Sequence, residues 1–325
     1  MEGIASARHG NYVESLEPLD EAVAIALDIA DVGAIAKLAA AQGLSHYMLH
    51  QFVSAAHYYH AALDAWRTLR IPAGSATADD VRFEIEILTR LSSQDLLLGR
   101  YREARRLLRT ARNLTSLVPD GDHIIGAIEW NLALLDRWRG EPERALRHGI
   151  AALAAYSTQG DSNNIARLRI VLADISLDLA NVYIDDVITD THDRLLTLAE
   201  PHLLYAQKAL RLAGEPTAEA MATLAHIRYL RASRDATVDR LATIESVIQQ
   251  AVALDDLTLI GQSLTARGDE LVARNQVESS QRAYRSAVEL LTQIGAPGLG
   301  ILARRALLRI EEGIGGVDDE SDDFE

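Results

Sequence analysis

The sequence contains no cysteine. Disulfide bonds, thiolate metal sites and cysteine nucleophiles are therefore excluded together. Aromatic side chains are also scarce, with three Phe and three Trp, whereas alanine and leucine abound. Small and unbranched side chains favour helices and let neighbouring helices approach closely, so the composition predicts an all-α protein with almost no strand.

Lysine occurs only at Lys37 and Lys208, so nearly every cation is arginine. This bias is typical of a GC-rich bacterial genome. Acidic residues outnumber basic ones, and the formal net charge at pH 7 is −15. Such a charge repels polyanions, so we expect neither nucleic acid nor a membrane surface as a partner.

Targeting signals are also missing from the sequence. The N-terminal residues have no apolar core flanked by positive charge, which argues against a secretory signal. The most apolar stretch is interrupted by Asp28, Asp31 and Lys37, which disfavours a transmembrane span. We therefore expect a cytoplasmic protein.

One pattern of small and apolar residues recurs along the chain. It is clearest in residues 98–111, where Gly99, Tyr101, Ala104, Leu108 and Ala111 follow helical spacing. The same spacing recurs around Ala62, Ala152 and Ala287, and we take the alanines at equivalent positions to be Ala62, Ala111, Ala152, Ala213, Ala251 and Ala287. One helix pair cannot bury its own apolar face, so the repetition predicts a solenoid of stacked pairs.

This pattern resembles the tetratricopeptide repeat (TPR), particularly the long-helix variety in bacterial signalling and transcription regulators, over residues 34–311. The resemblance implies a right-handed superhelical TPR-like α-solenoid of about five to six helix pairs with a C-terminal capping helix. We expect a partial repeat in residues 1–33, the solenoid in residues 34–312 with an insertion near 181–193, and a disordered acidic tail in residues 313–325. Pro18 is expected to open the first helix.

Helical spacing and turn residues place the expected helices along the chain. They cover residues 18–29, 34–50, 52–69, 81–98, 101–117, 124–139, 143–156, 165–180, 194–212, 218–232 and 238–254, a sixth pair near 264–271 and 275–287, and a final helix at 298–311.

The TPR resemblance implies that certain positions of each first helix face a concave groove. The expected groove residues are Trp130, Leu134, Arg137, Trp138, Tyr47, Met48 and Leu97. Trp130 and Trp138 lie about two helical turns apart beside Arg137, a composition typical of binding hot spots. Groove anchors must be partly exposed; in the alternative interpretation, both tryptophans fill gaps between helices.

Four histidines are the candidate metal ligands. His46 and His50 lie four residues apart on one expected helix, and His57 and His60 lie three apart on the next. Either spacing can present two imidazoles to one ion. We expect no metal site, because the two pairs are expected to face different sides; solvated or hydrogen-bonded histidines are the alternative.

Known catalytic and cofactor motifs are absent. The sequence has no phosphate-binding GxxxxGK[ST] loop, no GxSxG elbow, no HExxH pair and no dinucleotide-binding GxGxxG after a strand. The acidic run Asp185, Asp186, Asp190 and Asp193 lacks the Gly and the terminal Glu of a calcium loop. We therefore expect no cofactor.

The leading functional hypothesis is a non-enzymatic scaffold or adaptor that binds a peptide or protein partner in its concave groove. The alternative is a regulatory receptor for a small peptide or metabolite that controls a separate effector. An enzyme whose acidic and histidine side chains meet only in the fold is the third possibility. The oligomeric state cannot be read from the sequence.

Overall fold

The computed structural model describes residues 11–69, 76–119, 121–183 and 189–313. Within these residues, fourteen α-helices and one 3-10 turn form, and no strand occurs. The prediction of an all-α fold is therefore confirmed. The helices are α2 (Tyr12–Asp28), α3 (Val32–Met48), α4 (Phe52–Thr68), α5 (Ala78–Leu97), α6 (Tyr101–Leu114), α7 (Gly121–Trp138), α8 (Pro142–Gln159), α9 (Ser162–Val182), α10 (Thr189–Ala213), α11 (Pro216–Ala232), α12 (Arg240–Ala253), α13 (Leu257–Ala273), α14 (Val277–Gln293) and α15 (Ile301–Glu311).

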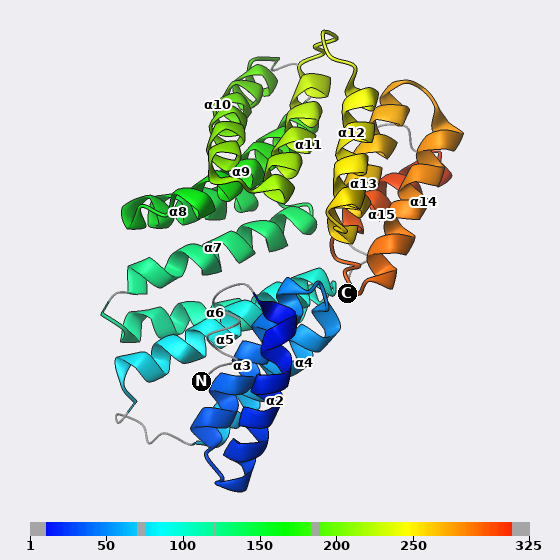
Figure 1. Cartoon of the computed structure of the whole chain (residues 1–325). Coiled ribbons are helices and arrows are strands. Elements are labelled where there is room, and N and C mark those ends of the chain that lie inside the picture. Colours follow the sequence, from blue (N-terminus) through cyan, green and yellow to red (C-terminus); the bar gives the residue numbers. More distant parts are fainter. Residues whose placement is uncertain (1–10, 70–75, 120, 184–188, 314–325) are drawn as a thin grey trace. The chain divides into compact units, whose positions relative to one another are not determined.

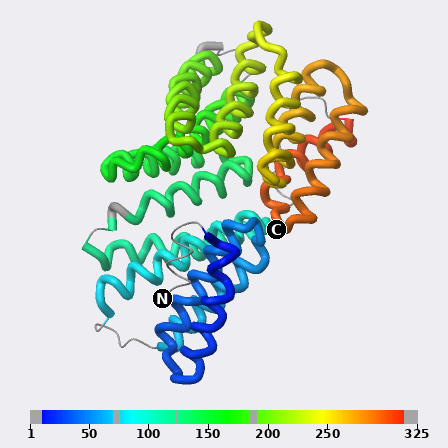
Figure 2. Tube along the Cα trace, in the orientation of Figure 1, coloured from blue at the N-terminus to red at the C-terminus, as the bar shows by residue number. Residues whose placement is uncertain are grey.

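Consecutive helices run back and forth and pack in adjacent pairs (Figures 1 and 2). The most extensive contacts join α3 with α4, α5 with α6, α9 with α10 and α13 with α14, which are four of the predicted pairs. Within unit 1, further contacts join α4 with α5, and within unit 2 they join α8 with α9, α10 with α11, α12 with α13 and α14 with α15. This arrangement is that of a TPR-like α-solenoid, in which each pair is buried by the next.

Two compact units make up the chain. Unit 1 comprises residues 1–131 and 294–298, and unit 2 comprises residues 132–293 and 299–325. Helix α7 belongs to both, because its first part, through Asn131, packs within unit 1 and the rest packs within unit 2. The candidate sites below each lie within one unit.

Alanine pairs seven residues apart form the tight contacts of the second helices. Ala55 and Ala62, Ala104 and Ala111, Ala145 and Ala152, and Ala199 and Ala206 are all fully buried. The expected equivalence of Ala213 is wrong, because Ala213 is exposed at the end of α10. Since α10 is 25 residues long, the buried pair falls earlier in the helix than the sequence spacing indicated.

The first helix begins earlier than expected. Helix α2 starts at Tyr12, so Pro18 lies inside the helix instead of at its first position. Its buried Leu19 and Ala26 pack with Leu38 of α3 in one small core. The N-terminal helix is therefore joined to the first complete pair through apolar contacts.

Two other expectations fall partly or wholly outside the described residues. Helix α9 continues to Val182 and α10 begins at Thr189, while residues 184–188 of the expected insertion lie outside. The acidic tail lies outside from residue 314 onward. Among the described helices, none is long and apolar enough to cross a membrane.

Glycines allow the two helices of a pair to approach closely where a tyrosine of the second helix lies over the first. A Cβ atom added to Gly43 would lie 3.0 Å from the Tyr59 ring, and one added to Gly268 would lie 2.5 Å from the Tyr284 ring. Both tyrosines are almost completely buried. Gly43 and Gly268 therefore both lie where the paired helices pack tightly.

We expect Gly268→Ala to lower the free energy of unfolding by about 1–3 kcal/mol, because the new methyl group overlaps the Tyr284 ring in a filled core. The matched control is Gly33→Ala in the first turn of α3, where an added Cβ meets nothing closer than 3.5 Å. The control should change stability by no more than about 0.5 kcal/mol. Urea denaturation followed by circular dichroism measures both; equal effects would contradict the close packing.

A buried carboxyl group near the end of α5 generates a second prediction. Asp95 is 1% exposed, and burial raises the pKa of this carboxyl to about 6, although Arg100 lies 3.7 Å away. The folded state therefore holds this proton more tightly than the unfolded chain, whose pKa is near the ordinary value of 3.8. Protonation of Asp95 therefore contributes to the free energy of unfolding. This contribution is complete below pH 3.8 and is lost as the pH rises to about 6.

Asp95→Asn should therefore raise the free energy of unfolding at neutral pH by roughly 1–3 kcal/mol and should reduce the loss of stability between pH 4 and 6. Chemical denaturation at several pH values provides the measurement. The exposed Glu278 of α14, replaced by Gln, is the control and should leave the pH profile unchanged, because it is not among the charges that act on Asp95. A variant with the same pH profile as the original chain would show that Asp95 does not titrate in this range.

Candidate functional site

Alternate helices of unit 2 contact one another. Helix α9 packs against α11, and α11 packs against α13. In the order of the chain these are first helices of consecutive pairs, which in a TPR-like solenoid share one surface. Charged side chains from these helices, and from the end of α7, meet there.

Four charged residues form the arginine–aspartate cluster: Arg137 of α7, Asp174 and Asp178 of α9, and Arg228 of α11. The Nε of Arg137 donates to Oδ2 of Asp178 at 2.7 Å, and its Nη1 lies 3.1 Å from Oδ2 of Asp174. Arg228 donates to the other oxygen of each aspartate, from Nη2 to Asp178 at 2.5 Å and from Nη1 to Asp174. Each carboxylate thus binds two guanidinium groups from two different helices.

The cluster is partly withdrawn from solvent, so its charges depend on one another. Burial by itself would raise the pKa of Asp178, but Arg137 and Arg228 outweigh this effect and hold the pKa below its usual value. The two aspartates in turn raise the pKa of Arg228 against the effect of its burial. Asp178 and Arg228 therefore stay charged at neutral pH, and the cluster ties α7, α9 and α11 together.

A second ionic contact continues onto α13. Nη2 of Arg231 donates to Oδ2 of Asp269 at 3.2 Å, and the hydroxyl of Tyr284 donates to Oδ1 of the same carboxylate at 2.7 Å. Burial and the adjacent Asp269 charge raise the pKa of Tyr284, so its hydroxyl keeps its proton and remains a donor. Asp269 therefore fixes one side of the Arg231 guanidinium.

A hollow lies beside these contacts, with a volume of about 190 Å³. We call it the Arg231 hollow; its lining residues are Leu177, Asn181, Arg228, Arg231, Ala232 and Arg234. The Nη1 of Arg231 is buried and has no hydrogen-bond partner in the described part of the chain. Buried donors without a partner are rare and costly, so this nitrogen marks a position where an acceptor fits.

The structure places the four expected groove residues of α7 in different environments. Arg137 is buried in the arginine–aspartate cluster, and Trp138 is 6% exposed. The expectation that these two side chains are partly exposed is therefore wrong, and Trp138 matches the alternative in which it fills a gap between helices. Trp130 and Leu134 are half-buried.

The other three expected groove residues belong to unit 1. Tyr47 and Met48 lie at the end of α3 and are 38% and 41% exposed, and the Tyr47 ring packs at 6.1 Å against the ring of Phe52. Leu97 ends α5, and its carbonyl oxygen accepts a hydrogen bond of 2.7 Å from the backbone N–H of Gly298. None of these three residues lines the Arg231 hollow, and their role as a binding surface remains a prediction.

The four histidines contact aromatic rings more than they contact one another. His46 stacks on Tyr58 with the ring centroids 4.8 Å apart, His57 meets the edge of the same tyrosine, and His50 meets Phe52. Burial lowers the pKa of His60. Among the described residues, no group of three or more potential ligands is arranged to hold a metal ion.

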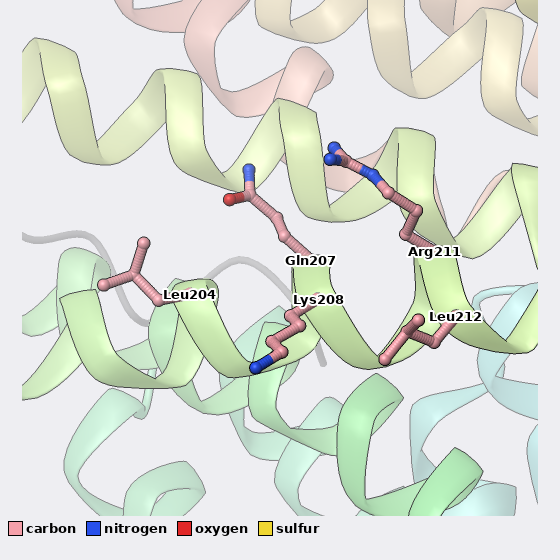
Figure 3. A pocket seen from close by; sticks show the side chains of 5 residues that line it. All are labelled: Leu204, Gln207, Lys208, Arg211 and Leu212. Carbon is pink, nitrogen blue, oxygen red and sulfur yellow. The ribbon is translucent and has the colours of Figure 1, made fainter.

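A second hollow lies on a single helix. Its lining residues Leu204, Gln207, Lys208, Arg211 and Leu212 all come from α10 (Figure 3). Arg211 is already paired with Glu219 at 2.8 Å, and Leu212 is 79% exposed. Because one helix forms all of it, this hollow offers a ligand no opposing wall, and the Arg231 hollow is the stronger candidate.

Sequence reasoning missed the residues around the Arg231 hollow. Asp174 and Asp178 are four residues apart on α9, and Arg228 and Arg231 are three apart on α11, so each pair shares a helix face. Applying the groove positions of the TPR pattern to these two first helices would have found them. Their repeats match the TPR pattern poorly, which is why the pattern gave no positions there.

No family model matches the chain, and no curated protein matches its sequence. Solved structures do match its fold. The apo form of RapI is similar with a TM-score of 0.66 and 12% identity over 95% of this chain and 97% of that one. A Rap protein complexed with Competence and Sporulation Factor has a TM-score of 0.53 and 12% identity over 87% of this chain and 76% of that one. These similarities support a TPR-like helical repeat fold.

Trp138 was interpreted either as an exposed groove anchor or as a side chain that fills a gap between helices. The two interpretations predict different effects of the same substitution on stability. We expect Trp138→Ala to lower the free energy of unfolding by about 3–5 kcal/mol, because it leaves a large cavity beside α7. Trp130→Ala, at a half-buried position on the same helix, is the control and should cost less. Thermal and urea unfolding measure both variants. A Trp138→Ala variant as stable as the original chain would favour the exposed groove anchor instead.

Proposed function

We propose that this chain is a non-enzymatic scaffold that binds a peptide or protein partner on the first-helix surface of unit 2, with an acidic group of the partner in the Arg231 hollow. The observation that carries the proposal is the buried Nη1 of Arg231, which has no acceptor among the described residues. A carboxylate supplies two acceptor oxygens to a guanidinium in one plane.

Local charge supports an acidic ligand even though the whole chain is negative. Four arginines, Arg137, Arg228, Arg231 and Arg234, lie in or beside the hollow, and three aspartates, Asp174, Asp178 and Asp269, oppose them. Arg234 makes no ion pair in the described part of the chain, and the exposed Asn181 adds a free amide donor. One carboxylate therefore balances the local charge.

The alternative is a regulatory receptor for a small peptide or metabolite that controls a separate effector. Two observations favour it: the hollow is small, and Arg228 both lines it and binds Asp174 and Asp178. An anion that competes for Arg228 would loosen the link between α9 and α11. A Rap protein of similar fold has been solved in complex with a named factor, which is consistent with either function.

The test selects peptides from a random displayed library on the intact chain and measures their affinity by fluorescence anisotropy. We expect the selected peptides to carry Asp or Glu, and Arg234→Gln to weaken them about tenfold by removing one charge-assisted hydrogen bond. Arg234 makes no ion pair in the described residues, so this variant should fold normally. Arg231→Gln should weaken binding further.

The matched control is Arg285→Gln, which removes one exposed arginine of α14 and should leave affinity unchanged. Peptides that bind the Arg234 and Arg231 variants as tightly as the original chain would contradict the site. The length of the selected ligands separates the two functions, because a scaffold gains affinity as the peptide is lengthened along the first helices. A receptor for a small ligand reaches full affinity with a few residues.

A further inference from the structure

Arginine is concentrated on one helix of unit 1. Helix α6 carries five arginines in 14 residues, namely Arg102, Arg105, Arg106, Arg109 and Arg112, and Arg100 precedes it. The only acidic residue within the helix is Glu103. In a chain whose formal net charge is −15, this helix is a local reversal of sign.

Three of these arginines form a row that faces solvent. Arg102, Arg106 and Arg109 follow i, i+4 and i+7 spacing, so they lie along one side of the helix, and all three are exposed. The opposite side is apolar and buried, through Ala104, Leu107, Leu108 and Ala111. Packing therefore requires only that the outer side be polar; it does not require five cations.

No salt bridge holds the row in the described part of the fold. Arg112 lies 3.3 Å from Glu129 and Arg100 lies 3.7 Å from Asp95, so the two ends of the arginine surface are paired. The side chains of Arg102, Arg106 and Arg109 make no ion pair or hydrogen bond within the described residues, although the charge of Arg106 helps to lower the pKa of Asp95 against its burial. Their guanidinium groups therefore keep their hydrogen-bond donors for a partner.

The arrangement also opposes helix formation. Arg102 lies in the first turn, where the partial positive charge of the helix N-terminus disfavours a cation, and Arg100 provides no side-chain cap. Arg102 with Arg106 at i,i+4, and Arg106 with Arg109 at i,i+3, are like charges, which repel each other. A feature that costs stability and lacks an intramolecular partner indicates selection for something outside the described fold.

We propose that the row formed by Arg102, Arg106 and Arg109 is a docking surface for an extended acidic segment of a partner protein, separate from the Arg231 hollow. From Arg102 to Arg109 the helix rises about 10 Å, which an extended peptide spans in about three to four residues. Aspartate and glutamate side chains along such a segment pair with successive arginines and remove their mutual repulsion. The chain would then hold two partners at once, as a scaffold does.

An acidic peptide fits this surface better than a nucleic acid does. A short peptide touches only the local cations, whereas a polynucleotide extends beyond α6 and meets the negative charge of the rest of the chain.

The test measures the fluorescence anisotropy of a labelled oligoglutamate peptide of about eight residues with the full chain at low ionic strength. We expect R102Q/R106Q/R109Q to weaken binding at least about tenfold, and added salt to weaken binding to the original chain. The matched control R282Q/R304Q/R309Q makes the same change in net charge with exposed arginines of α14 and α15, and should bind normally. The R231Q/R234Q variant should also bind the oligoglutamate peptide normally. A failure of the docking surface on α6 can therefore be distinguished from a failure of the function proposed for the Arg231 hollow.

Circular dichroism checks that each variant is folded; removing like-charge pairs should not lower the melting temperature of the α6 variant. Equal weakening by both triple variants would overturn the proposal, because only net charge would then matter. Binding of an oligonucleotide or of anionic vesicles through the same arginines, without binding of the peptide, would also overturn it. So would binding of the peptide only after removal of residues 316–325, since the acidic end of this chain would then be the occupant.

Discussion

Close approach between paired helices is the constraint on which the rest of this structure depends. Each helix buries one apolar face, and it does so against a partner whose contact positions are alanine or glycine. Alanine pairs seven residues apart recur fully buried from α4 to α10, and Gly43 and Gly268 lie under tyrosine rings. Because the backbones come so close, the polar outer positions of the helices are also fixed in place. Interaction surfaces can then be built without loops.

In unit 2, the fixed helices hold charged side chains in defined orientations. Asp174 and Asp178 each receive two guanidinium groups, and this reciprocal pairing offsets the desolvation of all four residues. The same geometry leaves Arg231 bound to Asp269 through Nη2, while its buried Nη1 has no hydrogen-bond partner among the described residues. A guanidinium that is oriented before a ligand arrives loses little side-chain entropy on binding. The hollow therefore combines a preorganised donor with a local excess of positive charge.

The fold was largely predictable from the sequence, whereas the site was not. Small residues at Gly43, Ala62, Ala104 and Ala111 report packing directly, because only a small side chain fits between close helices. Ala213 misled the same reasoning because α10 is long, so spacing alone chose the wrong turn. The role of Arg137 depended on the aspartates that α9 places opposite it, which no local pattern contains. Asp174 and Asp178 lie far from Arg137 in the sequence but bind it in the fold, so Arg137 links helices instead of lining an open groove.

Net charge is consequently a poor guide to the partners of a solenoid. A value of −15 describes the distant field of the chain, but ions in solution screen that field within about 10 Å. A bound peptide experiences the side chains it touches, and in this chain arginines are gathered at the Arg231 hollow and along α6 while acids are spread over other helices. The long-range repulsion of polyanions and the local attraction of short acidic segments are therefore compatible. If the two proposals above hold, a ligand of either arginine surface is selected by the charges that it touches and not by the net charge of the chain.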